Sequence, residues 1–98
     1  MAYTLIWSPT AQFDLRDLLS YISEFDSQAA ARFGKGLFDA VERLFDFPES
    51  GRVVPEFRDP MIREIIYKPC RIVYRLNKRK FLIEIARIWH SARGIPEV

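Results

Sequence analysis

Apolar residues follow a helical spacing in the first half of the chain and a strand spacing in the second. Residues 3–7 are mostly β-branched or aromatic and predict a short first strand. From Pro9 to Phe25 the apolar side chains recur every three or four residues, which predicts an amphipathic helix. Ser8 is a suitable N-cap for it, and Pro9 suits the first helical position. The apolar stripe consists of Ala11, Leu15, Leu18, Leu19 and Ile22.

A second apolar stripe predicts another helix after a short break. The break is at Asp26-Ser27, the stripe runs from Ala30 to Phe45, and Phe47-Pro48 ends it. Because the connection is short, we expect an antiparallel helical hairpin. Gly34 and Gly36 each weaken the second helix by about 1 kcal/mol relative to alanine. We expect them to allow close approach of another backbone.

The rest of the chain predicts a loop and three strands. Residues 48–60 contain three prolines and one glycine, which argues against a regular element there. Three strand-like segments follow, at Ile62–Tyr67, Arg71–Asn77 and Phe81–His90. Short polar turns join them, so we expect an antiparallel meander.

The order β-α-α-β-β-β predicts an α+β fold with two layers, in which the helical hairpin packs on an antiparallel sheet. Ninety-eight residues with 49% hydrophobic content suit a single domain, 1–98, with a real core. In the middle strand of the meander, alternation places Ile72, Tyr74 and Leu76 on the core face. It places Arg71 and Arg75 on the other face, which we expect to be partly open.

Charge is distributed unevenly along the chain, although the net charge is only +2. Residues 1–49 carry four basic and eight acidic groups, whereas residues 50–98 carry eleven basic and five acidic groups. The basic half suggests contact with a polyanion or an acidic partner, and chance clustering of surface cations is the alternative. No apolar run approaches about 20 residues, and no signal peptide is evident. Together with the single cysteine, Cys70, this predicts a cytoplasmic protein without membrane contact.

Two places in the basic half could carry chemistry. Arg71 and Arg75 lie on one strand face, two same-face steps apart, and could hold an anion or could simply keep the face soluble. His90 and Arg93 follow the last strand, where His90 could transfer protons or could bond a neighbouring carbonyl as a structural residue. Glu64 can pair with Arg71, and at the surface such a pair contributes about 0–1 kcal/mol. One histidine and one cysteine cannot form a zinc site, so we expect no metal and no cofactor.

Short motifs are spread over nearly the whole chain: Trp7-Ser8-Pro9, Asp14-Leu15, Tyr21-Ile22, Phe47-Pro48, Gly51-Arg52, Val54-Pro55-Glu56, Arg63-Glu64, Arg71-Ile72-Val73-Tyr74, Ile88–His90 and Arg93. Together they resemble the motifs of the RelE/ParE toxins, and the predicted element order agrees with that family's layout.

The resemblance implies the toxin of a type II toxin–antitoxin module, silenced by a cognate antitoxin through which any DNA contact is made. RelE-like members cut messenger RNA in the ribosome, and ParE-like members inhibit DNA gyrase. For a RelE-like enzyme, the resemblance assigns phosphate binding to Arg71 and Arg93, and proton transfer to His90. The C-terminal tyrosine of several nuclease members is missing, and Cys70 stands where a tyrosine often precedes the arginine.

These departures favour a ParE-like, non-enzymatic gyrase inhibitor. A ribosome-dependent nuclease and a non-toxic protein-binding module remain the alternatives. We expect the antitoxin to cover apolar helix surface and to neutralise part of the basic half. The expected target-binding residues are Arg63, Lys68, Arg71, Arg75 and Arg93.

Overall fold

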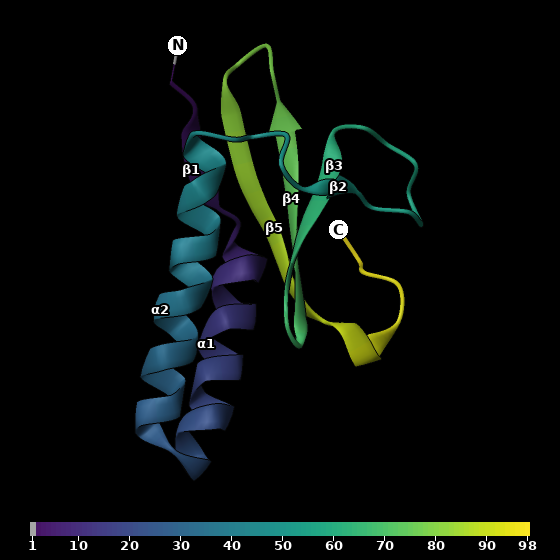
Figure 1. Cartoon of the computed structure of the whole chain (residues 1–98). Coiled ribbons are helices and arrows are strands. Elements are labelled where there is room, and N and C mark those ends of the chain that lie inside the picture. The colour runs from purple at the N-terminus through teal and green to yellow at the C-terminus, as the bar shows by residue number, and fades with distance from the viewer. Residues whose placement is uncertain (1) are drawn as a thin grey trace.

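Two helices lie side by side on one face of a five-stranded sheet, as the computed structural model shows (Figure 1). The structure describes residues 2–98, so Met1 of the predicted domain 1–98 lies outside the described residues. The predicted two-layer α+β arrangement is confirmed, and the predicted bounds of α1 and β3 coincide with those observed. In chain order the elements are β1 (Thr4–Trp7), α1 (Pro9–Phe25), α2 (Ser27–Glu42), the 3-10 helix η1 (Arg43–Phe45), β2 (Arg52–Val53), β3 (Ile62–Tyr67), β4 (Cys70–Asn77), β5 (Leu82–His90) and the 3-10 helix η2 (Ser91–Arg93).

The sheet has the strand order β1-β5-β4-β3-β2, and it differs from the prediction in two ways. Strands β3, β4 and β5 form the expected antiparallel meander, but β1 pairs in parallel with β5, so the sheet is mixed. The 48–60 segment is not free of regular structure, because β2 pairs antiparallel with β3. Proline lacks the N–H that strand pairing needs, and the next proline after Pro48 is Pro55. Arg52 and Val53 can therefore pair with Glu64 and Arg63.

The start of α1 covers the part of β5 that extends beyond β1. The Ser8 backbone N–H donates to the Ile85 carbonyl at 2.9 Å, and the Ser8 hydroxyl donates to the Ala86 carbonyl at 2.9 Å. One turn further on, an Asp14 carboxylate oxygen accepts from the Ile88 N–H at 3.1 Å. Beyond the end of β1, the N-terminal turns of α1 therefore satisfy hydrogen-bonding groups of the β5 backbone. These bonds fix the helix relative to the end of β5.

The core lies between the helices and the predicted face of β4. Tyr74 is fully buried, and its hydroxyl donates to the Pro48 carbonyl at 2.8 Å. Gly36 allows a close approach, but to a side chain rather than to the expected backbone: a Cβ there would lie 2.1 Å from the Tyr67 hydroxyl oxygen. That hydroxyl reaches the carbonyl of Phe33 at 3.2 Å. The most deeply buried side chains include Leu37, Leu44, Ile72, Tyr74, Leu76, Ile83 and Ile85.

The opposite face of the sheet is closed at one end and open at the other. At the closed end the C-terminal segment crosses the sheet, where the Gly94 carbonyl accepts from Trp89 Nε1 at 3.2 Å and the Glu97 carbonyl accepts from Arg87 at 3.0 Å. At the open end Arg75 is exposed and pairs with Glu84. The partly open face is thus confirmed for the Arg75 end only. Among residues 2–98, no helix has the length and apolar character needed to cross a membrane.

Replacing Asp14 by alanine should destabilise the protein by about 2–3 kcal/mol. The change leaves the Arg87 guanidinium, which now donates to Asp14 at 2.8 and 3.1 Å, without its counter-charge, and removes the acceptor of the Ile88 N–H. Urea unfolding measures the loss. Asp17→Ala, on an exposed position of the same helix, is the matched control and should change stability by less than about 0.5 kcal/mol. Equal effects of the two substitutions would contradict this role of Asp14.

Candidate functional site

Arg71 lies in a network of ion pairs rather than on an open surface. Its Nε donates to Glu64 Oε1 at 2.5 Å, and its two terminal nitrogens donate to the two carboxylate oxygens of Glu56 at 2.8 and 3.0 Å. The Glu64 side chain has no exposed surface, and its second oxygen accepts from Arg52 Nε at 2.7 Å. Arg71 itself is 8% exposed. The expectation that Arg71 faces solvent is therefore wrong, because two carboxylates occupy its guanidinium and the segment around Glu56 covers it.

These pairs shift the protonation equilibria of their members. The bonds that Arg71 donates, followed by a backbone hydrogen bond, lower the pKa of Glu56 from its ordinary 4.5 to about 2. The same bonds to Glu56, and then those to Glu64, raise the pKa of Arg71. The pair of Arg71 with Glu64 was predicted as a surface contact, whereas it is buried. Near neutral pH the guanidinium is thus permanently charged and already matched by carboxylates.

The other predicted target-binding cations are spread over the surface of the sheet. Arg63 holds the loop, since it donates to the carbonyls of Pro60, Glu49 and Gly51 at 2.9, 3.2 and 3.0 Å. Lys68 is exposed in the turn between β3 and β4. The exposed Arg75 donates to Glu84 at 3.0 Å. None of these side chains pairs with Arg71 among the contacts of residues 2–98.

His90 and Arg93 come together at the end of β5, as the sequence predicts. His90 Nδ1 accepts from the Ala92 N–H at 3.1 Å and so caps η2. The Nδ1 atom of His90 is therefore engaged by the backbone of η2. The Arg93 guanidinium lies 4.0 Å from the centre of the Trp89 ring, and that of Arg87 lies 4.8 Å from it. A buried indole thus holds two cations near the C-terminus.

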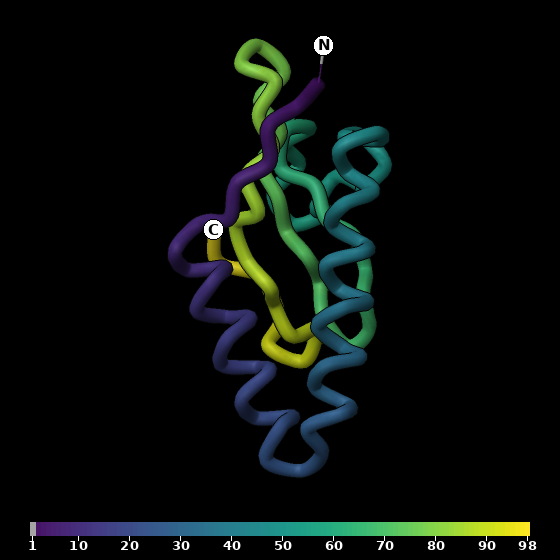
Figure 2. The backbone as a smooth tube through the Cα atoms, turned by 90° about the vertical axis from the view of Figure 1, so that its left-hand side faces the viewer, coloured from purple at the N-terminus to yellow at the C-terminus, as the bar shows by residue number. Residues whose placement is uncertain are grey.

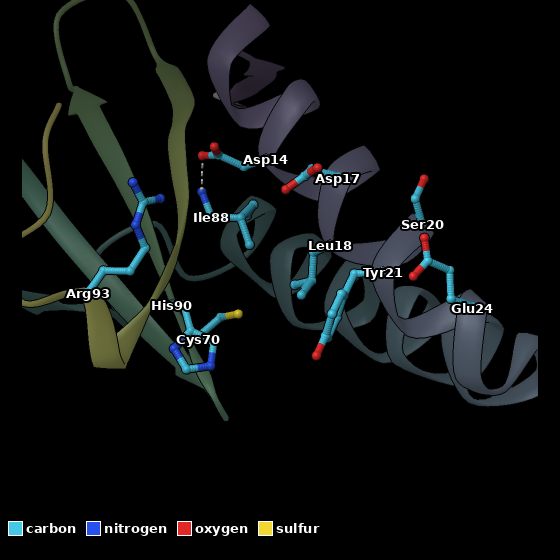
Figure 3. A pocket seen from close by; sticks show the side chains of 10 residues that line it. All are labelled: Asp14, Asp17, Leu18, Ser20, Tyr21, Glu24, Cys70, Ile88, His90 and Arg93. Carbon is cyan, nitrogen blue, oxygen red and sulfur yellow. Dashed lines mark hydrogen bonds between the residues drawn. The ribbon is translucent and has the colours of Figure 1, made fainter.

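A cleft of about 350 Å³ separates α1 from the end of β5. Figure 3 shows His90 and Cys70 on the sheet side of this cleft, with Asp17, Tyr21 and Glu24 opposite them on α1. Arg93 also lines the cleft, but Arg71 does not. The structure therefore brings two of the three candidate catalytic residues to one cleft and places the third in a separate, closed network.

Thiol and metal chemistry have little support in this cleft. Cys70 pairs with His90 across the sheet but is only 1% exposed, and burial followed by the charge of Asp14 raises the pKa of its thiol. A raised pKa leaves little thiolate at neutral pH. Within the part of the chain that the structure describes, no three His, Cys, Asp or Glu side chains are placed to hold a metal ion.

Sequence reasoning missed the roles of Glu56, Arg87 and Trp89. A bulge between Val73 and Tyr74 shifts the register of β4 against β5. Without knowledge of this bulge, the alternation of side chains does not predict that Arg87 and Trp89 lie on the same face as Arg71. Glu56 belongs to a proline-rich loop, and no local pattern tells which strand residue it meets. Its appearance in the Val54-Pro55-Glu56 motif was the one available signal.

Comparison with known proteins shows the family of the chain. Residues 5–95 match the family described as the ParE toxin of the type II toxin–antitoxin system parDE. Toxin RelE2 of Caulobacter vibrioides is 32% identical over 91% of this chain and 96% of its own length. Toxin RelE1 of the same organism is 33% identical over 93% of this chain and 96% of its own length.

A solved structure has the same fold. It is described as a chromosomal ParDE toxin–antitoxin system from P. aeruginosa, and it matches with a TM-score of 0.72 at 22% identity. The match covers 90% of this chain and 95% of the other. With the family match over residues 5–95, the fold and the relatives agree: the chain belongs to the ParE toxins of the RelE/ParE superfamily, the toxin components of type II toxin–antitoxin systems.

Proposed function

We propose that this toxin acts by binding DNA gyrase in the cytoplasm and is not itself a nuclease. The observation that carries the proposal is the state of Arg71, whose guanidinium is bound by Glu56 and Glu64 and is 8% exposed. RNA cleavage by attack of a 2′-hydroxyl needs cations that reach the charged phosphorane. An arginine already paired with two carboxylates is poorly suited to that task.

The remaining candidate catalytic groups also support a binding role. His90 Nδ1 is engaged by the backbone of η2, and the cleft beside His90 is lined by Asp17 and Glu24. Carboxylates at these positions repel a phosphodiester. A RelE-like nuclease remains the second candidate, because two relatives over 30% identical are named RelE toxins and because His90 and Arg93 do share a cleft.

The surface proposed for target binding is the open end of the sheet together with the C-terminal segment. Arg75 is exposed at the open end, Lys68 is exposed in the turn at the other end of β3 and β4, and Arg93 is exposed at η2. Ile95 and Val98 are 62% and 43% exposed, beside the cations held by Trp89. Exposed apolar and cationic groups on a rigid base are typical of protein-binding surfaces.

Family membership implies an antitoxin partner, and we propose that it binds an apolar groove at the junction of α1, α2 and β1. The groove has a volume of about 670 Å³, and Phe38 and Ile6 in it are 45% and 43% exposed. Phe38 packs on Trp7 with ring centres 5.4 Å apart, so the groove has a rigid aromatic floor. The groove is lined by Ile6, Trp7, Gln12, Leu15, Arg16, Leu19 and Phe38.

Purified toxin should inhibit supercoiling by gyrase in vitro, and Arg93→Glu should raise the half-inhibitory concentration about tenfold, since it inverts one charge and breaks the stack on Trp89. Arg32→Glu, at an exposed position of α2, is the matched control and should leave inhibition unchanged. Lack of inhibition at saturating toxin would refute the proposal. New cuts in translated message by primer extension would then favour the nuclease.

Phe38→Asp should weaken antitoxin binding about 100-fold, because it places a charge in the apolar groove. Calorimetric titration with the cognate antitoxin measures the change. Phe25→Asp removes an even more exposed phenylalanine, 75% exposed at the far end of α1, and should bind as the wild type does. Equal losses for both variants would place the antitoxin elsewhere. Affinity should also fall with added salt if the basic half contributes.

Glu56→Gln should reduce the dependence of stability on pH between about pH 4.5 and pH 2. The folded pKa of Glu56, about 2, lies below its ordinary 4.5, so the wild type keeps this stabilisation above pH 4.5 and loses it as the pH falls toward 2. Urea midpoints across that window should therefore converge for wild type and variant at the acid end. Glu24→Gln, an exposed carboxylate on α1, is the control and should follow the wild type. Parallel curves for all three proteins would show that Glu56 is not held by Arg71.

A further inference from the structure

We propose that the turn between β4 and β5, together with an aromatic cleft beside it, binds a stretch of unpaired RNA. The proposal rests on the geometry of this end of the molecule and does not depend on gyrase inhibition. In both views the turn projects beyond the rest of the sheet, at the opposite end from the turn between the two helices (Figures 1 and 2). A nucleic acid strand can approach it without meeting the helices.

The turn presents three consecutive cations. Lys78, Arg79 and Lys80 are all exposed, and the Asn77 side chain fixes the turn by accepting from the Lys80 N–H at 3.1 Å. Phe81 closes it with a φ of +51°, a conformation that a bulky residue adopts only at a cost. Such a backbone holds the cations on one short, projecting segment, which is a suitable contact for successive phosphates.

An aromatic cleft of about 600 Å³ lies beside these cations. Phe47 and Tyr3 line it, and Phe47 is 64% exposed. Tyr3 is held in place by an edge-to-face contact with Phe81, with ring centres 5.5 Å apart. Lys78 also lines the cleft, so the aromatic surface and the cationic turn are continuous.

This combination fits an unpaired nucleic acid strand such as RNA better than a duplex or an acidic peptide. Splayed bases stack on exposed aromatic rings while cations track the backbone. A duplex keeps its bases inside and cannot use Phe47, and an acidic peptide without aromatic residues, such as oligoglutamate, has no flat ring to stack on it. Glu49 in the cleft forms an ion pair with Lys78, so this carboxylate competes with phosphate for Lys78, whereas Arg79 and Lys80 are exposed. We therefore assign phosphate contact mainly to Arg79 and Lys80, and stacking to Phe47.

Fluorescence anisotropy with a labelled uridine 12-mer tests the site on the full chain. Phe47→Ala should weaken binding about tenfold, in line with the loss of one stacked base. The double variant Arg79→Ala/Lys80→Ala should also weaken it at least tenfold and should lower the slope of log affinity against log salt by about 1.4, the value for two phosphate contacts on a single strand. Arg32→Ala/Lys35→Ala removes the same charge from exposed positions of α2 and should leave both the affinity and the slope unchanged.

Three results would overturn the inference: equal losses in the two double variants, unchanged affinity in Phe47→Ala, or equal competition by an RNA duplex or an oligoglutamate. Wild-type urea midpoints for all variants exclude misfolding as the cause of a loss. Supercoiling inhibition, measured in parallel, should be the same for Phe47→Ala and wild type. The proposal of RNA binding and the proposal of gyrase inhibition can therefore be refuted independently of each other.

Discussion

The arrangement of this sheet depends on a carboxylate that has no contact with water. The Glu64 side chain is completely buried, and moving an unpaired carboxylate out of water costs several kcal/mol. Arg71 and Arg52 supply the counter-charges, each through its Nε, and Glu56 completes the pairing of Arg71. These residues come from β2, β3, β4 and the loop between β2 and β3, so neutralising the Glu64 charge fixes these four parts of the chain relative to each other. Removing Arg71 would leave the buried Glu64 carboxylate with the 60% exposed Arg52 as its counter-charge.

The same rule holds at the other edge of the sheet, where Asp14 joins α1 to β5 through Arg87. The Arg87 guanidinium also reaches the Glu97 carbonyl and lies over Trp89, so this pair connects the helical layer to the C-terminal segment. Ion pairs in this protein therefore fix loops and chain ends to a sheet whose core is apolar. Cations available to partners include those at the periphery, at the open end of β4, in the β3–β4 and β4–β5 turns and at η2.

Local patterns were sufficient for the elements and insufficient for the site. The stripe from Ala11 to Ile22, with Ser8 as cap, predicted α1 to the residue, because helix periodicity and capping are local properties. Alternation placed Tyr74 correctly in the core and Arg71 correctly on the opposite face. It could not show what covers that face, since Glu56 meets Arg71 across 15 residues of chain. Nor could it show the parallel pairing of β1 with β5, which joins the two ends of the sequence.

Burial of Arg71 also bears on how far family likeness extends to mechanism. For Arg71 to bind a phosphate, the bidentate pair with Glu56 would have to break. The phosphate would then approach a guanidinium still paired with Glu64, and the repulsion between two anions in a poorly hydrated site would offset much of the gain. A protein target needs no such rearrangement, because Arg75, Arg93 and the exposed Ile95 already face solvent. The two candidate functions therefore differ in whether they require the ion pairs of Arg71 to break. A toxin that binds a protein target does not need to break them, whereas a nuclease must offset this free-energy cost with the free energy of substrate binding.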